Sequence, residues 1–176
     1  MNLPSMARPS LAALLAAFSL AALLTALFAE SRAIAQFTPG QVEPLSANTV
    51  PEADRIEPEA LNQILTSKSA TSQKPVVLQV GFRIMFAQAH IPDAQFVGPD
   101  SKPDGIEALE HAVAPLAKDR FMVLYCGCCP WTRCPNIGPA YRRLRELGYS
   151  HVKVLYLANN FGDDWVSKGY LTAHGQ

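Results

Sequence analysis

All four cysteines of this 176-residue chain lie in one short segment, which reads YCGCCPWTRCPN from Tyr125 to Asn136. A thiolate is both a nucleophile and a soft metal ligand, so clustered thiols predict either sulfur chemistry or ligation. A disulfide framework instead spaces its cysteines along the chain, so that each bridge closes a loop of useful length. The clustering therefore favours chemistry or ligation over simple cross-linking.

The segments on either side of the cysteines position the first of them, Cys126. The apolar run Phe121 to Tyr125 predicts a buried strand, and Ala140 to Leu147 predicts a helix. Loop amides and the positive end of a following helix lower a thiol pKa and increase its thiolate fraction. Cys126 is thus the candidate nucleophile, and Arg133 is the nearest cation that can hold the oxygens of a thiosulfate-like donor.

The remaining cysteines, Cys128, Cys129 and Cys134, leave three alternatives open. One of them can act as a resolving thiol toward Cys126. Cys134 can form a disulfide with Cys128 or Cys129, which suits an oxidising compartment. The four thiols can also bind a soft metal, Cu(I) or Zn, although zinc sites usually draw on two separated cysteine pairs. The disulfide or redox interpretation is favoured over the metal.

The N-terminus predicts export. Arg8 precedes an uncharged run rich in Leu and Ala, and the small-residue pattern Ala33-Ile34-Ala35 follows. These features predict a signal peptide over residues 1–35, with an uncleaved membrane anchor as the alternative. Residues 36–54 have three prolines and no periodicity, which predicts a linker before a single domain at 55–176. We therefore expect an exported protein, in a bacterial periplasm, or else secreted or membrane-anchored.

The domain alternates predicted strands and helices. Strands are expected at 75–80, 95–97, 121–125 and 152–157, and helices at 56–65, 106–116 and 137–147, with Asp163 or Asp164 capping a last short helix that carries Trp165. This order predicts an α/β fold with a mainly parallel sheet flanked by helices. Ligands of such sheets bind beyond the carboxyl ends of the strands, where the cysteines follow. Equal numbers of basic and acidic residues, 15 each, give no indication of a nucleic-acid partner.

Several short motifs together resemble the rhodanese-like domains. They comprise the strand Val76–Val80, Ala89-His90-Ile91-Pro92-Asp93-Ala94, Tyr125-Cys126, Leu144-x-x-Leu147-Gly148-Tyr149, and Trp165 with Gly169-Tyr170. The resemblance covers about Arg55 to Leu171. It implies a rhodanese-like α/β fold, a structural place for His90, and a Cys126 persulfide that carries sulfane sulfur. The chain departs from the family where Gln79 and Gly81 replace an Asp and an Arg, where Ala89 replaces a Gly, and in its longer cysteine segment.

The resemblance implies a sulfurtransferase without a cofactor, which takes sulfur from a small donor such as thiosulfate and passes it to a thiol acceptor. Its substrate would be bound by Gly127, Cys128, Cys129, Trp131 and Arg133. One alternative is a non-enzymatic thiol module that binds Cu(I) or Zn or exchanges disulfides with an exported redox partner. Another is a degenerate interaction domain. A membrane partner is expected only if the N-terminal segment stays uncleaved.

Overall fold

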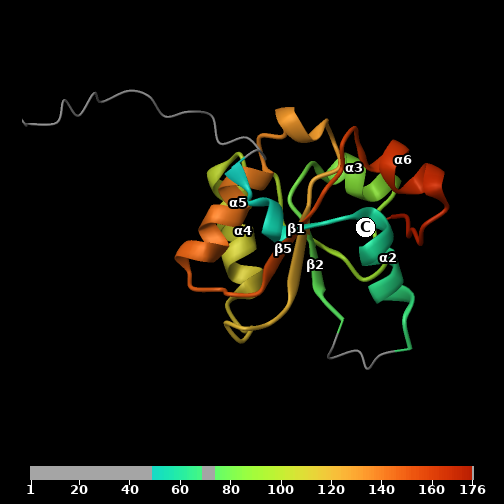
Figure 1. The fold of residues 1–176 in the computed structure, drawn as a ribbon. Coiled ribbons are helices and arrows are strands. Elements are labelled where there is room, and N and C mark those ends of the chain that lie inside the picture. Colours follow the sequence, from blue (N-terminus) through green and yellow to red (C-terminus); the bar gives the residue numbers. More distant parts are fainter. Residues whose placement is uncertain (1–48, 69–73, 176) are drawn as a thin grey trace, which may run out of the picture. The chain divides into compact units, whose positions relative to one another are not determined.

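The structure is a computed structural model that describes residues 49–68 and 74–175. The predicted signal peptide and most of the predicted linker lie outside the described residues. The described chain forms a five-stranded sheet in which all paired neighbours run parallel, in the order β1-β5-β4-β2-β3 (Figure 1). The strands are β1 (Arg55–Ile56), β2 (Val76–Gln79), β3 (Gln95–Phe96), β4 (Met122–Tyr125) and β5 (Val152–Leu155).

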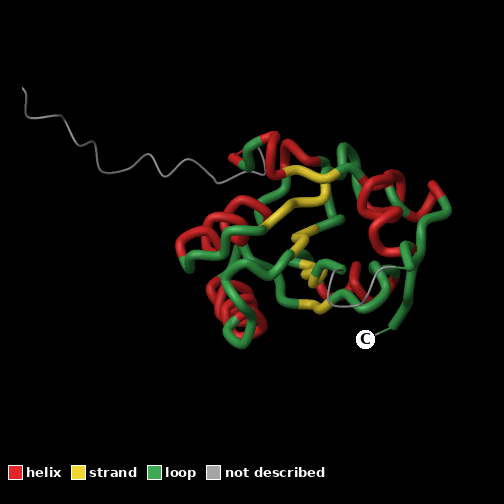
Figure 2. Tube along the Cα trace, turned by 60° about the horizontal axis from the view of Figure 1, so that its bottom comes forward, coloured by secondary structure: helices red, strands yellow, loops and turns green. Residues whose placement is uncertain are grey.

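Helices cover both faces of this sheet, as Figures 1 and 2 show. They are α2 (Pro58–Thr66), α3 (Arg83–Gln88), α4 (Pro103–Val113), α5 (Ile137–Glu146) and α6 (Phe161–Asp164). Successive strand residues point to opposite faces, and two cores result. One core joins Leu124 of β4 to α4 and α5, and the other joins Val123 to α2 and α6. β4 is the central strand of the sheet, and its four residues are all buried.

The predicted α/β class and the mainly parallel sheet are confirmed. The sequence reasoning missed β1, and its assignment of Ile56 to a helix face is wrong. A two-residue edge strand has too few positions to show a period of two, so its pairing with β5 leaves no pattern in the sequence. Helix α4 begins at Pro103, earlier than expected, because proline fits the first helical turn. It ends before Pro115, as predicted.

The C-terminal segment corrects one prediction and confirms another. Asn160 caps α6, since its side chain accepts a hydrogen bond from the Asp163 amide at 2.9 Å. The expected cap, Asp163 or Asp164, therefore lies inside the first turn, where a carboxylate favours the positive helix end. The last short helix is confirmed as α6, and Trp165, directly after it, is fully buried in the core.

His90 occupies a structural position, as the resemblance implied. Its Nδ1 lies 2.8 Å from the Phe86 carbonyl oxygen, and its ring stacks on the Phe86 ring with centroids 3.9 Å apart. Within the described residues, no helix has both the length and the apolarity that spanning a membrane requires.

Candidate functional site

The candidate site lies at the carboxyl end of β4, where residues 126–136 form what we call the cysteine loop. Hydrogen bonds from other elements fix its course. The Phe161 amide donates to the Gly127 carbonyl at 3.1 Å, and the Trp131 amide donates to the Ala158 carbonyl at 3.2 Å. Gln79, at the end of β2, donates from its Nε2 to the Cys126 carbonyl at 3.0 Å. The loop is therefore attached to the ends of its neighbouring strands, where ligands of parallel sheets bind.

The sulfur atoms of the cysteine loop form a contiguous series. The Sγ atoms of Cys126 and Cys128 are 3.2 Å apart, and those of Cys128 and Cys129 are 3.3 Å apart. All three lie within 4.8 Å of one another. In this structure the four cysteines are free thiols. A disulfide of Cys134 with Cys128 or Cys129 stays a prediction for the protein in an oxidising compartment. Burial decreases along the series: Cys126 is buried, whereas Cys128 and Cys129 are half-buried.

Asn136 positions Cys126, and the sequence reasoning did not identify it. Its side chain is fully buried, and its Nδ2 donates to the Cys126 Sγ at 3.3 Å. Its Oδ1 accepts a hydrogen bond from the Ser101 amide at 2.9 Å. Both ends of the amide are thus used, and the residue links α5 to the loop before α4. An Asn just before a helix is usually interpreted as a cap, which is why its contact with Cys126 was not expected.

The thiol pKa values differ from the prediction for Cys126. Hydrogen bonds with the thiols of Cys128, Cys129 and Cys134, together with burial, raise the pKa of Cys126 well above its usual range. The pKa of Cys134 is instead lowered, first by hydrogen bonds with Cys126 and Cys128 and further by the backbone amides of Ile137 and Asn136. The pKa of Cys129 is also lowered, first by its hydrogen bond with Cys126. Negative charge in the cluster is therefore favoured at Cys134 and Cys129 over Cys126, and a second thiolate beside the first is disfavoured.

Cys126 also borders a pocket of about 100 Å³, which none of the other cysteines lines. The pocket lies between the strand ends, α3 and α6. Met85 and Ala89 line one side, and Phe161 and Val166 line the other. Of the residues predicted to bind substrate, only Gly127 lines this pocket together with Cys126. A small molecule in the pocket would meet Cys126 directly.

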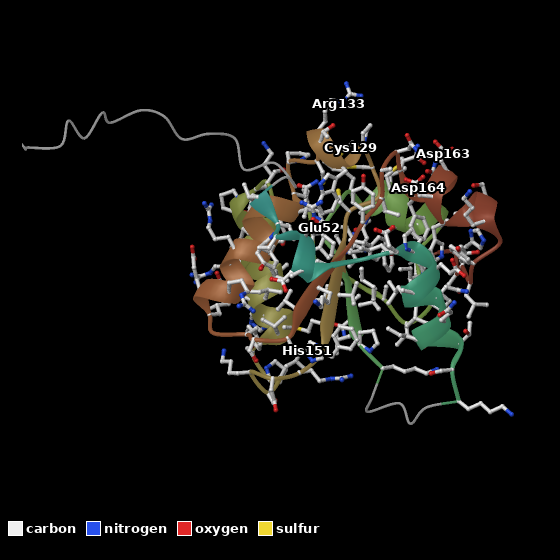
Figure 3. All side chains as sticks on the ribbon, viewed as in Figure 1. Glu52, Cys129, Arg133, His151, Asp163 and Asp164 are labelled. Carbon is white, nitrogen blue, oxygen red and sulfur yellow. The ribbon has the colours of Figure 1, made fainter. Side chains whose placement is uncertain are left out.

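The other predicted substrate residues lie elsewhere. Trp131 is buried, with its ring centroid 5.1 Å from that of Tyr156, so it belongs to the core. Cys128 and Cys129 border the opposite core cluster and do not line the pocket. Arg133 is exposed, and Figure 3 shows its side chain pointing outward at the end of the molecule. The structure therefore does not place the Arg133 guanidinium at the pocket, because the turn Trp131–Arg133 directs it to solvent.

Gln79 and Gly81 stand where the resemblance expected an Asp and an Arg. The Gln79 Oε1 accepts a hydrogen bond from the Gly81 amide at 3.2 Å, so the Gln79 amide bonds at both ends. A Cβ atom on Gly81 would lie 2.7 Å from the Cys126 carbonyl oxygen and 3.1 Å from its Sγ. Gly81 thus leaves room for Cys126, and a longer side chain at this position requires a different loop.

Comparisons with solved structures identify the fold. The crystal structure of the Alr3790 protein from Anabaena sp. is similar, with a TM-score of 0.51 and 20% identity, covering 68% of this chain and 92% of that chain. The solution structure of the rhodanese-like domain of Alr3790 gives a TM-score of 0.51 at 20% identity, covering 69% and 79%. The BH2092 protein from Bacillus halodurans gives 0.51 at 18% identity, covering 68% and 76%.

Two further comparisons find nothing: no protein-family model and no curated protein matches the sequence. The structural similarity and the sequence motifs agree on one architecture, with Cys126 at the end of its central strand. The chain has the rhodanese-like fold.

Proposed function

We propose that this protein transfers sulfane sulfur through a persulfide on Cys126. The supporting observation is the place of Cys126, which borders the pocket on one side and lies 3.2 Å from the Cys128 sulfur on the other. A donor in the pocket would contact Cys126, and the Cys128 sulfur, a second nucleophile, is in contact with Cys126. The N-terminal sequence pattern supports an exported location for this reaction.

The sulfur series gives the transfer a direction. The outer sulfur of a Cys126 persulfide, attacked by a Cys128 thiolate, would leave Cys126 as a thiolate and create a persulfide on Cys128. One sulfur–sulfur bond forms as another breaks, so no external oxidant is needed. A second such step reaches Cys129, which is 3.3 Å from Cys128 and half-buried. Sulfur would thus move from the buried pocket to a position where an acceptor thiol can collect it.

Mass spectrometry of the purified protein tests this proposal. After brief exposure to limiting thiosulfate or cysteine persulfide, peptide mapping should find the mass of one added sulfur first on Cys126. Cys126→Ser should abolish the addition, and Cys129→Ser should leave sulfur on Cys126 and Cys128. If Cys126 gains no sulfur from any donor, the proposal is wrong.

A second candidate is soft-metal binding, which one observation favours. The sulfurs of Cys126, Cys128 and Cys129 lie within 4.8 Å of one another, as three ligands of one ion must. Three thiolates suit Cu(I), whereas structural zinc takes four ligands. The chemistry of this donor set therefore fits Cu(I) better than Zn.

Titration of the reduced protein with Cu(I) against a competing chelator tests this candidate. It predicts uptake of one ion per chain, and Cys129→Ser, which removes a direct ligand, should weaken that uptake by more than the roughly 10- to 100-fold that loss of an outer-shell partner costs. Cys134→Ser serves as the comparison, because Cys134 does not belong to the three-sulfur group. A protein that takes up no Cu(I) excludes the candidate.

A further inference from the structure

The wall of the pocket beside Cys126 is apolar and uncharged. None of the residues that line it is a Lys, Arg, His, Asp or Glu. Phe161, Val166, Met85 and Ala89 supply hydrocarbon and thioether surface. Its volume of about 100 Å³ is below the usual range for small-molecule sites, so only a small group fits inside it. Whatever part of a donor remains in this pocket is surrounded mainly by apolar atoms.

Most of the polar groups in the wall already have partners. The Gln79 amide donates to the Cys126 carbonyl and accepts from the Gly81 amide. The Tyr125 hydroxyl accepts a hydrogen bond from the Ile91 amide at 3.2 Å. The amide of Gln88 is left for a ligand, and it is neutral. The pocket therefore offers little to an ion that must lose its water.

Charged residues near the pocket do not compensate for this. The Arg83 guanidinium of α3 lies 4.1 Å from the Phe96 ring centroid, and Arg133 points to solvent (Figure 3). His174 is exposed, with its Nδ1 2.5 Å from the Gln88 carbonyl oxygen. Asp163 and Asp164 directly follow the pocket residue Gly162, so the charges of α6 are negative (Figure 3). Neither carboxylate lines the pocket, because Asp163 accepts from the Asn160 side chain and Asp164 from the Asn159 and Asn160 amides. The residues that line the pocket supply no cation to an anion there.

We propose that the physiological sulfur donor is an organic persulfide, R–S–SH, in which R is small, uncharged and apolar. The inference rests on the proposed function and names its substrate class. Thiosulfate and R–S–SH present the same kind of outer sulfur to Cys126, and they differ in the group left behind. That group is a charged sulfite for thiosulfate and an apolar thiol for R–S–SH. An ion that is buried without a partner loses its hydration energy and gains nothing in return. An apolar R group, in contrast, is stabilised by leaving water.

The transfer step balances without a further reactant. The Cys126 thiolate attacks the outer sulfur of R–S–SH, and a bond forms between its Sγ and that sulfur. The sulfur–sulfur bond of the donor breaks, and R–S⁻ leaves and takes a proton from water. Cys126 is left as a persulfide, and the total oxidation state of the sulfurs is unchanged.

A comparison of two donors tests the inference. Benzyl persulfide and thiosulfate are each allowed to react with the purified protein in separate experiments. For each donor, the rate of persulfide formation on Cys126 is divided by the rate at which the same donor reacts with a free thiol in solution. We expect this ratio to be about ten-fold or more higher for benzyl persulfide, in line with the cost of burying an unpaired ion.

Val166 offers a matched pair of variants, because it lines the pocket and is 39% exposed, so that a longer side chain can reach solvent. Val166→Arg should raise the thiosulfate ratio and lower the benzyl persulfide ratio. Val166→Leu should keep the wild-type preference. Thiosulfate reacting as fast as benzyl persulfide, or no change of preference in Val166→Arg, overturns the inference while Cys126 still gains sulfur. The absence of sulfur on Cys126 from both donors would overturn the proposed function as well.

Discussion

Cys126 and Cys134 divide between them two properties that a single catalytic cysteine often combines. Cys126 borders the pocket but has a raised pKa, while Cys134 has a lowered pKa and does not line the pocket. Cys134 is one of the causes that raise the pKa of Cys126, while contact with Cys126 is the first cause that lowers the pKa of Cys134. A negative charge on Cys134 therefore keeps Cys126 in its thiol form at neutral pH, and Cys134 restrains the nucleophile.

This role predicts a pH-dependent effect of Cys134→Ser. The variant should speed modification of Cys126 at pH 7, because Cys134 is one of the causes that raise the Cys126 pKa. Each unit by which the Cys126 pKa falls should increase the rate at pH 7 by about tenfold. In both proteins the rate should rise with pH as Cys126 ionises, and in the variant this rise should begin at a lower pH. Alkylation with iodoacetamide, followed by peptide mapping, measures the rate.

Cys134→Asp is the control for that measurement, because it keeps a negative charge at this position. It should retain the slow reaction of the wild type at pH 7. If Cys134→Ser matched the wild type in rate and profile, the charge of Cys134 would have no effect on the Cys126 pKa.

At the scale of the elements, the cysteine loop and α6 are fitted closely at Gly127. Gly127 has a φ of 80°, which L side chains rarely adopt, and a Cβ atom there would lie 2.8 Å from the Phe161 Cβ. Gly127→Ala should therefore combine the cost of a left-handed conformation with displacement of α6 from the pocket. We expect it to lower the free energy of unfolding by about 2–4 kcal/mol and to slow persulfide formation.

Gly169→Ala separates the two causes. Gly169 has a similar φ of 73°, and a Cβ there has nothing within 4 Å, so its substitution should cost only the backbone conformation, about 1 kcal/mol. Urea unfolding of both variants gives the difference, which measures the contact with Phe161. Equal losses would show that α6 moves freely away from the loop.

The elements also show what the sequence can and cannot predict. β4 is a continuous apolar run and the helix after the cysteines has an amphipathic period, so their types, and Cys126 at the strand end, followed from local sequence. The pocket wall did not, because Met85, Phe161 and Val166 come from separate segments that only the tertiary fold brings together. Arg133 was assigned to the site by its proximity in sequence. The conformation of its turn, which sequence proximity does not determine, directs it to solvent instead.

At the scale of the whole molecule, one buried carboxyl group couples stability to pH. Asp100 is 1% exposed, and neither of its carboxylate oxygens has a hydrogen-bond partner among the described residues. Burial raises its pKa to about 8 from the ordinary 3.8. At pH values between about 4 and about 8, the Asp100 carboxyl is ionised in the unfolded chain and still protonated in the folded chain. The folded state therefore binds more protons in this window, and its stability falls as pH rises from about 4 to about 8.

Asp100→Asn should remove this contribution, because an amide does not titrate. The free energy of unfolding of the wild type, measured by urea between pH 5 and 8, should fall more steeply than that of the variant, by up to about 1.4 kcal/mol per pH unit. Asp104→Asn, at an exposed position in α4, controls for the loss of one carboxylate. Parallel curves for the wild type and Asp100→Asn would mean that Asp100 is ionised in the folded protein. A partner for its charge would then have to exist, since an isolated carboxylate is not stable in an apolar core.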